Sequence, residues 1–274
     1  MERIDRIVQS CPRRDLRPIL ETALRASLEG GAILRRLFGR PIGIQHKGDI
    51  DLVTEADIAS EKRILGILGE SMPGVPVLSE ESSTGHVPQG ASWIVDPLDG
   101  TTNFAHGFPW FAVSIAFGQE AGIEAGVVYA PLQEEIYHAV RGCGAWLNGT
   151  RIQVSRIAEL EVALLGTGFP YDVRSSHEHI MAAFQAVIKK AQGIRRAGAA
   201  ALDLAFVAAG RLDGFWEVKL KPWDTAAGLL LVEEAGGMVT DFASGPYNPS
   251  LQEILATNRL IHRELSEILQ GFRP

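Results

Sequence analysis

Two carboxylates, a main-chain carbonyl and a hydroxyl fall within the six residues Asp96-Pro97-Leu98-Asp99-Gly100-Thr101. The segment follows the apolar run Trp93-Ile94-Val95, which is typical of a buried strand, so we expect the carboxylates at a strand end. Hard cations such as Mg²⁺ bind oxygen ligands of this kind. The alternative is a plain turn, because Pro fixes φ and Gly supplies a positive φ.

Four further acidic residues lie at predicted edges of elements, where ligand sites tend to collect: Asp51, Glu80, Glu81 and Asp224. Asp96 and Asp99 can converge on one ion or bridge two, and Leu98 adds its carbonyl between them. Two metal ions about 3.5 to 4 Å apart would stabilise the attacking and leaving oxygens of a phosphoryl displacement. If the acidic residues only capped helices and turns, nothing would require them to converge in one cleft.

A water nucleophile also needs a proton acceptor. Thr101 can orient a water and pass its own hydrogen bond to Asp51, so an Asp-Thr pair is a plausible general base. The sequence has no Gly-x-Ser-x-Gly elbow, P-loop or His-Glu-x-x-His motif, which removes the commonest alternative hydrolases. We interpret His177 and His179 as surface residues.

Composition bounds the class of protein. A chain of 274 residues with 46% hydrophobic residues can form one large domain or two fused lobes. The net charge of −7 argues weakly against nucleic acid as the main ligand, although the first forty residues are rich in Arg. That Arg excess predicts a solvated helix face, with a partner-docking surface as the alternative. Cys11 and Cys143 are the only cysteines, which favours a reducing compartment and no Cys-based zinc site. We find no membrane span and expect a soluble, cytoplasmic protein.

Periodicity predicts the elements that position these residues. Residues 16–37 have helical spacing, and a second helix begins near Thr54, which forms a capping box with Asp57. We expect that helix to turn Ile58, Ile64, Leu65 and Leu68 inward. A short strand over 75–79 presents Glu80 at its exit. Runs at 111–117, 122–130 and 136–140 predict an antiparallel meander that continues through a tight turn at Asn148-Gly149.

The composition shifts after about residue 155. Strand patterns at 163–166, 194–196, 214–217 and 238–240 alternate with helical patterns at 176–190, 199–209, 224–235 and 259–269. This alternation predicts α/β layers in the second half. We therefore expect an N-terminal lobe over 1–155 and a C-terminal lobe over 156–274, with a cleft between them.

Four segments in order resemble the inositol monophosphatase family, and most closely its bacterial SuhB-type branch: Asp51-Leu-Val-Thr-Glu-Ala-Asp57, Ser79-Glu80-Glu81-Ser82, Asp96-Pro-Leu-Asp-Gly-Thr-Thr-Asn-Phe104 and Trp223-Asp224-Thr-Ala-Ala-Gly228. The resemblance implies an α/β fold layered as an αβαβα sandwich and Mg²⁺-dependent hydrolysis of phosphomonoesters, often inhibited by lithium. It also implies a homodimer.

The resemblance assigns roles to individual residues. Two to three Mg²⁺ ions would be held by Glu80, Asp96, the Leu98 carbonyl, Asp99 and Asp224, and catalysis would use Asp51, Thr101 and Glu80. The matched substrate-binding positions are Asp99, Gly100, Thr101, Arg195, Gly198, Ala199, Ala200, Glu217 and Asp224.

The same resemblance bears on the substrate. Thr102-Asn103-Phe104 favours inositol phosphates, of which inositol 1-phosphate is the leading candidate, since branches acting on nucleotide 3′-phosphates or histidinol phosphate typically carry charged variants there. Fructose 1,6-bisphosphate and other sugar phosphates stay open as alternatives. A different kind of alternative is a regulatory protein that contacts RNA polymerase or RNA, as SuhB-like proteins can.

Overall fold

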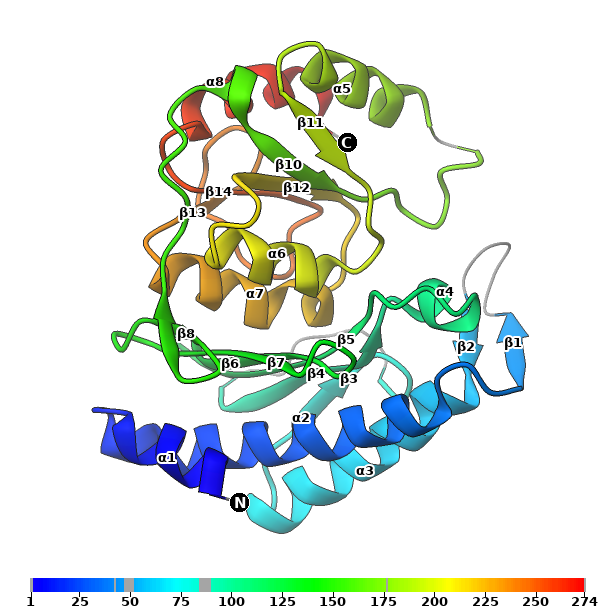
Figure 1. Cartoon of the computed structure of the whole chain (residues 1–274), viewed down its shortest axis with the longest axis vertical. Helices are drawn as coiled ribbons and strands as arrows, with labels where there is room; N and C mark the ends of the chain where they lie inside the picture. The colour runs from blue at the N-terminus through cyan, green and yellow to red at the C-terminus, as the bar shows by residue number, and fades with distance from the viewer. Residues whose placement is uncertain (1, 42, 47–51, 84–89, 176, 274) are drawn as a thin grey trace.

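Five layers of secondary structure alternate between helices and sheets (Figure 1). The computed structural model describes residues 2–41, 43–46, 52–83, 90–175 and 177–273, with the side chains of 44–46 left aside. From the N-terminal side, the layers are α1–α3, a seven-stranded sheet, α6 with α7, a five-stranded sheet, and α5 with α8. This order confirms the predicted αβαβα sandwich.

Each layer is built from short elements. The α-helices of the described chain are α1 Glu2–Ser10, α2 Arg17–Leu37, α3 Glu55–Ser71, α4 Thr101–Ala105, α5 Glu178–Ile188, α6 Ala200–Ala208, α7 Pro222–Glu234 and α8 His262–Leu269. The large sheet consists of β3 Val77–Ser79, β4 Ser92–Asp99, β5 Ala112–Gln119, β6 Gly122–Ala130, β7 Glu135–Val140, β8 Ala145–Leu147 and β9 Thr150–Ile152. A two-stranded sheet consists of β1 Ile44–His46 and β2 Leu52–Thr54. A five-stranded sheet consists of β10 Leu164–Thr167, β11 Gly193–Arg195, β12 Gly214–Val218, β13 Met238–Thr240 and β14 Glu253–Thr257.

Sheet order places the ends of several strands near one another. In the large sheet the strands follow chain order from β3 to β9, with β3 parallel to β4 and every later pair antiparallel. The five-stranded sheet has the order β11-β10-β12-β14-β13, and β12 lies parallel to β10 at its centre. The loops after β10 and β12 therefore begin at the same end of that sheet, where the carboxyl ends of the two parallel strands lie.

The α6–α7 layer is shared by both large sheets. Gly126 of β6 packs against the backbone of α7, because a Cβ there would lie 3.0 Å from the Cα of Ala227. Gly228 of α7 packs against α6 as closely, since a Cβ at this position would lie 2.5 Å from the Cβ of Leu204. One hydrophobic cluster joins these two helices to both sheets. Small residues thus let the central helices approach each other and the sheet.

Most predicted elements are confirmed at close to their predicted bounds. Thr54 and Asp57 form the capping box at the start of α3. The Asn148-Gly149 turn joins β8 to β9 with φ angles of 52° and 83°, as a two-residue hairpin turn requires. The prediction that Ile58 points inward is wrong, because that side chain is 50% exposed. The strand β14, which pairs with β12 and β13 in the five-stranded sheet, was not predicted from the sequence.

Two further expectations concern the whole chain. No helix of the described residues combines the length and the apolar character needed to cross a membrane. The division into lobes at residue 155 falls in the segment between β9 and β10. That the lobes act as separate domains stays a prediction, as do the homodimer and the cytoplasmic location.

The close approach of α6 and α7 predicts the effect of one added methyl group. We expect Gly228→Ala to lower the free energy of unfolding by about 1 to 3 kcal/mol, because the methyl group must displace Leu204 in a packed core. Urea denaturation measures the change. Gly66→Ala in α3 is the matched control: no atom of the described residues lies within 4 Å of its Cβ position, so the substitution should stabilise the helix by roughly 0.5 to 1 kcal/mol. Equal stabilities of the two variants would contradict the packing argument.

Candidate active site

A cleft of about 270 Å³ lies where the end of β4 meets the first turns of α6 and α7. Its walls hold every predicted metal ligand, namely Glu80, Asp96, Leu98, Asp99 and Asp224. It is also lined by the predicted substrate positions Gly100, Thr101, Gly198, Ala199, Ala200 and Glu217. Residues from 80 to 224 in the chain thus meet in one place, as the sequence predicted for a site formed only by folding.

The β4 strand carries the central carboxylates through an irregularity. Pairing with β5 is regular up to Asp96, which lies opposite Ser114, and the register shifts before Asp99, which lies opposite Ala112. Asp96 and Asp99 are therefore inside the strand's end rather than beyond it. Gly100 follows with φ 96°, and a Cβ there would lie 2.9 Å from the Trp110 carbonyl oxygen. Only glycine fits this turn from β4 into α4.

Asp99 links the two halves of the chain. Its Oδ2 accepts a hydrogen bond of 2.8 Å from the backbone N–H of Ala201, in the first turn of α6. Helix α6 has no side-chain cap of its own, because its N-cap residue is Ala199. A carboxylate from β4 thus caps a helix that follows it by about a hundred residues in sequence. This contact fixes Gly198 and Ala199 against the cleft.

Two other carboxylates are oriented in the same way. The Oδ1 of Asp96 accepts from the N–H of Leu98 at 2.9 Å, and the Oδ2 of Asp224 accepts from the N–H of Lys221 at 2.7 Å, at the start of α7. A carboxylate has about four lone-pair sites, so a bond to one amide leaves acceptor capacity for a cation. Backbone amides thus orient three of the predicted ligands.

The cleft concentrates negative charge away from water. Burial raises the pKa of Asp96 well above its usual range, and the charges of Glu80, Asp99 and Asp224 raise it further. Burial and the charge of Glu80 raise the pKa of Asp99 to about 7, against the stabilising effect of the α6 amides. Carboxylates held so close repel each other, and a bound cation would relieve that repulsion.

The donor set suits a hard divalent cation. Carboxylates and a main-chain carbonyl are the ligands Mg²⁺ prefers. Within the described ranges, no three His, Cys, Asp or Glu side chains stand in an arrangement that could hold a metal ion as they are oriented. The fit therefore rests on the chemistry of the donors and on the mutual effect of their charges on the Asp96 pKa.

Thr101 has a partner that the sequence analysis treated only as a helix cap. Its Oγ1 lies 2.9 Å from the Oδ1 of Asp57 and 3.1 Å from the carbonyl oxygen of Leu98. Asp57 uses its other oxygen for the cap, accepting from the N–H of Thr54 at 2.8 Å. The predicted partner, Asp51, lies outside the described residues. The capping box was the available signal, since a cap occupies one carboxylate oxygen and leaves the second for another donor.

One predicted substrate residue, Arg195, lies outside the cleft lining. Arg195 is exposed at the end of β11 and does not line the cleft, whereas the adjacent Arg196 does. Side chains alternate between faces along an extended segment, so neighbours point to opposite sides. The Arg196 guanidinium lies 5.5 Å from the ring centre of Phe169, another residue of the cleft. Arg196 is therefore the arginine of this pair that lines the cleft, and a substrate-binding role for Arg195 stays a prediction.

Buried acids continue behind the cleft. Burial raises the pKa of Glu217 well above its usual range, and the charges of Asp224 and Asp203 raise it further. Asp203 in α6, which sequence reasoning missed, also has a strongly raised pKa through burial, and its buried Oδ1 has no hydrogen-bond partner in the described structure. His177 and His179 are exposed, as predicted.

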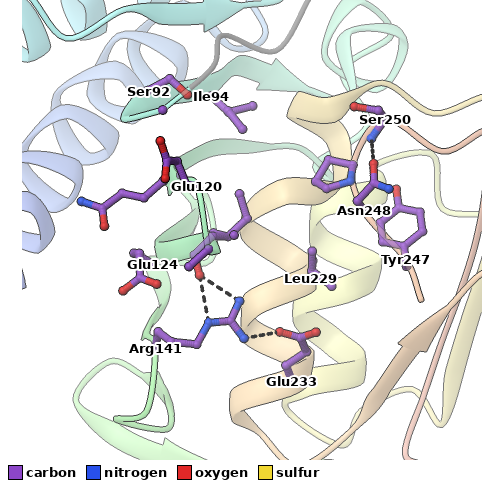
Figure 2. Close-up of a pocket in the computed structure, with 17 residues that line it drawn as sticks. Ser92, Ile94, Glu120, Glu124, Arg141, Leu229, Glu233, Tyr247, Asn248 and Ser250 are labelled. Atoms are coloured by element: carbon purple, nitrogen blue, oxygen red, sulfur yellow. Dashed lines mark hydrogen bonds and ion pairs between the residues drawn. The ribbon is translucent and has the colours of Figure 1, made fainter.

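A larger hollow lies elsewhere on the described surface. It measures about 820 Å³ and lies at the other end of α7, beside Leu229 and Glu233 (Figure 2). Its Arg141 is engaged by the Ile123 carbonyl and by Glu233, at 2.6 Å from the latter. None of the predicted site residues that the structure describes lines it. Size alone therefore does not identify the site; the convergence of carboxylates does.

Charge repulsion in the cleft predicts a pH-dependent stability in the absence of metal. The pKa of Asp99 rises from 3.8 to about 7, so the folded state binds more protons than the unfolded state between these values. Stability should consequently fall as the pH rises from about 4 to 7 in the presence of a chelator. Asp96→Asn removes one charge from the cleft, so we expect this variant to have a free energy of unfolding about 1 to 3 kcal/mol higher at pH 8 in the presence of a chelator.

Thermal melts of the protein in the presence of a chelator measure how its stability changes with pH. Millimolar Mg²⁺ should raise the melting temperature of the native chain more than that of Asp96→Asn, since a ligand that binds the folded state stabilises it by mass action. Asp5→Asn, on the exposed face of α1, is the control. It should change neither the stability at pH 8 nor the rise in melting temperature with Mg²⁺. A lower stability of Asp96→Asn at pH 8 would refute the repulsion.

Comparison with known proteins agrees with the geometry. An inositol-1-monophosphatase of Synechocystis sp. is 46% identical over 257 residues, covering 93% of this chain and 90% of the relative. The Nus factor SuhB of Pseudomonas aeruginosa is 43% identical over 268 residues, covering 94% and 98%. The crystal structure of the extragenic suppressor protein suhB from Bartonella henselae superposes with a TM-score of 0.87 at 42% identity, covering 92% of this chain and 98% of that one. Residues 15–271 match the sequence profile of the inositol monophosphatase family. The chain therefore belongs to the inositol monophosphatase family, a family of metal-dependent phosphatases.

Proposed function

We propose that this chain hydrolyses inositol 1-phosphate to myo-inositol and phosphate in a Mg²⁺-dependent reaction. The observation that carries the proposal is the convergence of Glu80, Asp96, Asp99 and Asp224 beside the Thr101–Asp57 hydrogen bond. Two relatives named inositol-1-monophosphatase, from Synechocystis sp. and Rhizobium meliloti, support the choice of substrate. Fructose 1,6-bisphosphate and other sugar phosphates are the competing substrates.

The acidic residues would hold two to three Mg²⁺ ions through Glu80, Asp96, Asp99, Asp224 and the Leu98 carbonyl. When bound, the ions supply positive charge that attracts the phosphate and makes a water easier to deprotonate. The amides at the start of α4 have no helical acceptor one turn earlier, so those of Gly100 and Thr101 can donate to phosphate oxygens. Sensitivity to lithium is expected from the family resemblance.

The chain's own proton path begins at Thr101. Because its hydroxyl donates to the Oδ1 of Asp57, the lone pairs of Oγ1 are available to accept from a water in the cleft. As the water attacks phosphorus, its proton passes to Oγ1 while the Thr101 proton passes to Asp57. Burial raises the pKa of Asp57, which favours its taking up that proton. We propose Asp57 for the role first predicted for Asp51.

The alcohol half of the substrate would lie against the first turn of α6. Gly198, Ala199 and Ala200 line this side of the cleft and their small size leaves room for a ring. Asp99 and Glu217 would provide acceptors for ring hydroxyls, and Arg196 would provide a donor.

Phosphate release separates the two candidates for the proton acceptor. With Mg²⁺ and inositol 1-phosphate, Asp57→Asn should lower kcat by roughly 10² to 10⁴-fold, the usual contribution of a general base. Asp51→Asn should lower it less than tenfold. Asp5→Asn is the control, and circular dichroism checks that Asp57→Asn keeps α3. A larger loss for Asp51→Asn would restore the first assignment.

A substrate panel tests the reaction itself. Inositol 1-phosphate should give the highest kcat/KM, followed by fructose 1,6-bisphosphate, with histidinol phosphate and adenosine 3′,5′-bisphosphate far lower. If no inositol monophosphate releases phosphate while another ester does, the substrate assignment fails and the phosphatase assignment stands.

A second candidate function is regulatory binding to RNA polymerase or RNA. The supporting observation is the 43% identity to a protein named Nus factor SuhB. Several arginines of the Arg-rich segment already have partners, since Arg13 pairs with Asp15 at 2.7 Å and Arg35 with Glu134 at 2.6 Å. Arg6 and Arg14 are exposed, so Arg6→Glu with Arg14→Glu should abolish capture of RNA polymerase while phosphate release continues. If the double variant captures RNA polymerase as well as the native chain does, the surface that carries Arg6 and Arg14 is not the binding surface.

A further inference from the structure

A second cavity of about 200 Å³ adjoins the candidate active site. It lies between α5, the end of β12 and the C-terminal segment of the chain. Most of its lining is apolar: Phe169, Ile180, Ala183, Phe184, Trp216, Val218, Phe242 and Phe272. Five residues line both this cavity and the cleft, namely Gly168, Phe169, Glu217, Val218 and Lys219. We call it the aromatic pocket.

The wall between the cleft and the aromatic pocket is thin. A Cβ at Gly168 would lie 2.1 Å from a carboxylate oxygen of Glu217, so that carboxylate lies directly over the glycine. Glu217 is buried, with 8% of its surface exposed. A carboxyl group at the junction of the two cavities can form hydrogen bonds with a molecule that occupies both.

Phe169 forms the other part of the wall. Its ring lies 5.5 Å from the Arg196 guanidinium, which lines the cleft, and 6.0 Å from the ring of Phe184, which lines the pocket. Phe169, Phe184 and Phe272 are all partly exposed. Partly exposed aromatic rings around a concave space beside a reaction site are typical of a ligand pocket.

We propose that the aromatic pocket is a subsite for the alcohol part of the substrate, and that it takes an apolar or aromatic group attached to the phosphomonoester. This inference rests on the proposed phosphatase function of the adjoining cleft. The volume suits one ring, because an apolar cavity of about 150 Å³ holds benzene. The phosphate would stay among the carboxylates while the apolar group reaches the pocket along the residues that line both cavities. The chain would then accept aryl-alkyl phosphates as well as polyol phosphates.

Binding of non-hydrolysable analogues tests the subsite apart from turnover. In calorimetry with Mg²⁺, 3-phenylpropylphosphonate should bind at least about tenfold more tightly than propylphosphonate, a difference of about 1.4 kcal/mol. Ile180→Trp, which fills the pocket, and Phe184→Ala, which removes one wall, should each reduce this preference to less than about threefold. Both should leave the affinity for propylphosphonate unchanged. Phe108→Ala, at an exposed phenylalanine outside both cavities, should keep the full preference.

Three results would overturn the subsite. They are equal affinities for the two phosphonates, a preference unaffected by Ile180→Trp and Phe184→Ala, or no binding of either phosphonate at millimolar concentration. If 3-phenylpropanol alone bound as tightly as the phosphonate, the pocket would be a separate effector site and the proposal would also fail. Hydrolysis of inositol 1-phosphate is measured in parallel: its absence alongside a retained phenyl preference would refute the proposed function and leave the subsite standing.

Discussion

The hydrogen bond from the N–H of Ala201 to Asp99 is the contact on which the site depends. It joins the end of β4, in the large sheet, to the first turn of α6, between the sheets. Because α6 begins with alanines, it cannot cap itself, and the carboxylate of a distant strand satisfies its amides and interacts favourably with the positive end of its dipole. The same carboxylate lies in the cleft. One residue thus holds the two halves together and contributes to the candidate chemistry.

The cleft is costly to the fold and useful to the function for the same reason. Burial and mutual repulsion raise the pKa values of Asp96 and Asp99. The ionised carboxylates are therefore less stable in the folded chain than in the unfolded chain, where water surrounds them. The core around α6 and α7 offsets this cost with close packing at Gly126 and Gly228. A cation in the cleft would remove the repulsion, so metal binding and folding stability are linked.

The subsite proposed for the adjoining aromatic pocket would extend this picture from phosphate to alcohol. The polar cleft and the apolar pocket meet at Gly168, where the absence of a side chain leaves space for the Glu217 carboxylate. A phosphatase whose metal ligands recognise only the phosphate gains its specificity from the walls beyond them. Here those walls come from β12, α5 and the loop after β10, all in the second half of the chain.

The sequence by itself determined the layers and the carboxylates of the site. Hydrophobic periodicity, the capping box at Thr54 and the Asn148-Gly149 turn are local signals, and the Asp96 to Thr101 run carries its chemistry in adjacent residues. Tertiary structure alone decided which side chains face each other across the cleft. It paired Thr101 with Asp57, which are 44 positions apart, and turned Arg196 rather than Arg195 into the cleft. These choices depend on strand register and on the direction of each side chain, and both are settled only when distant segments pack together.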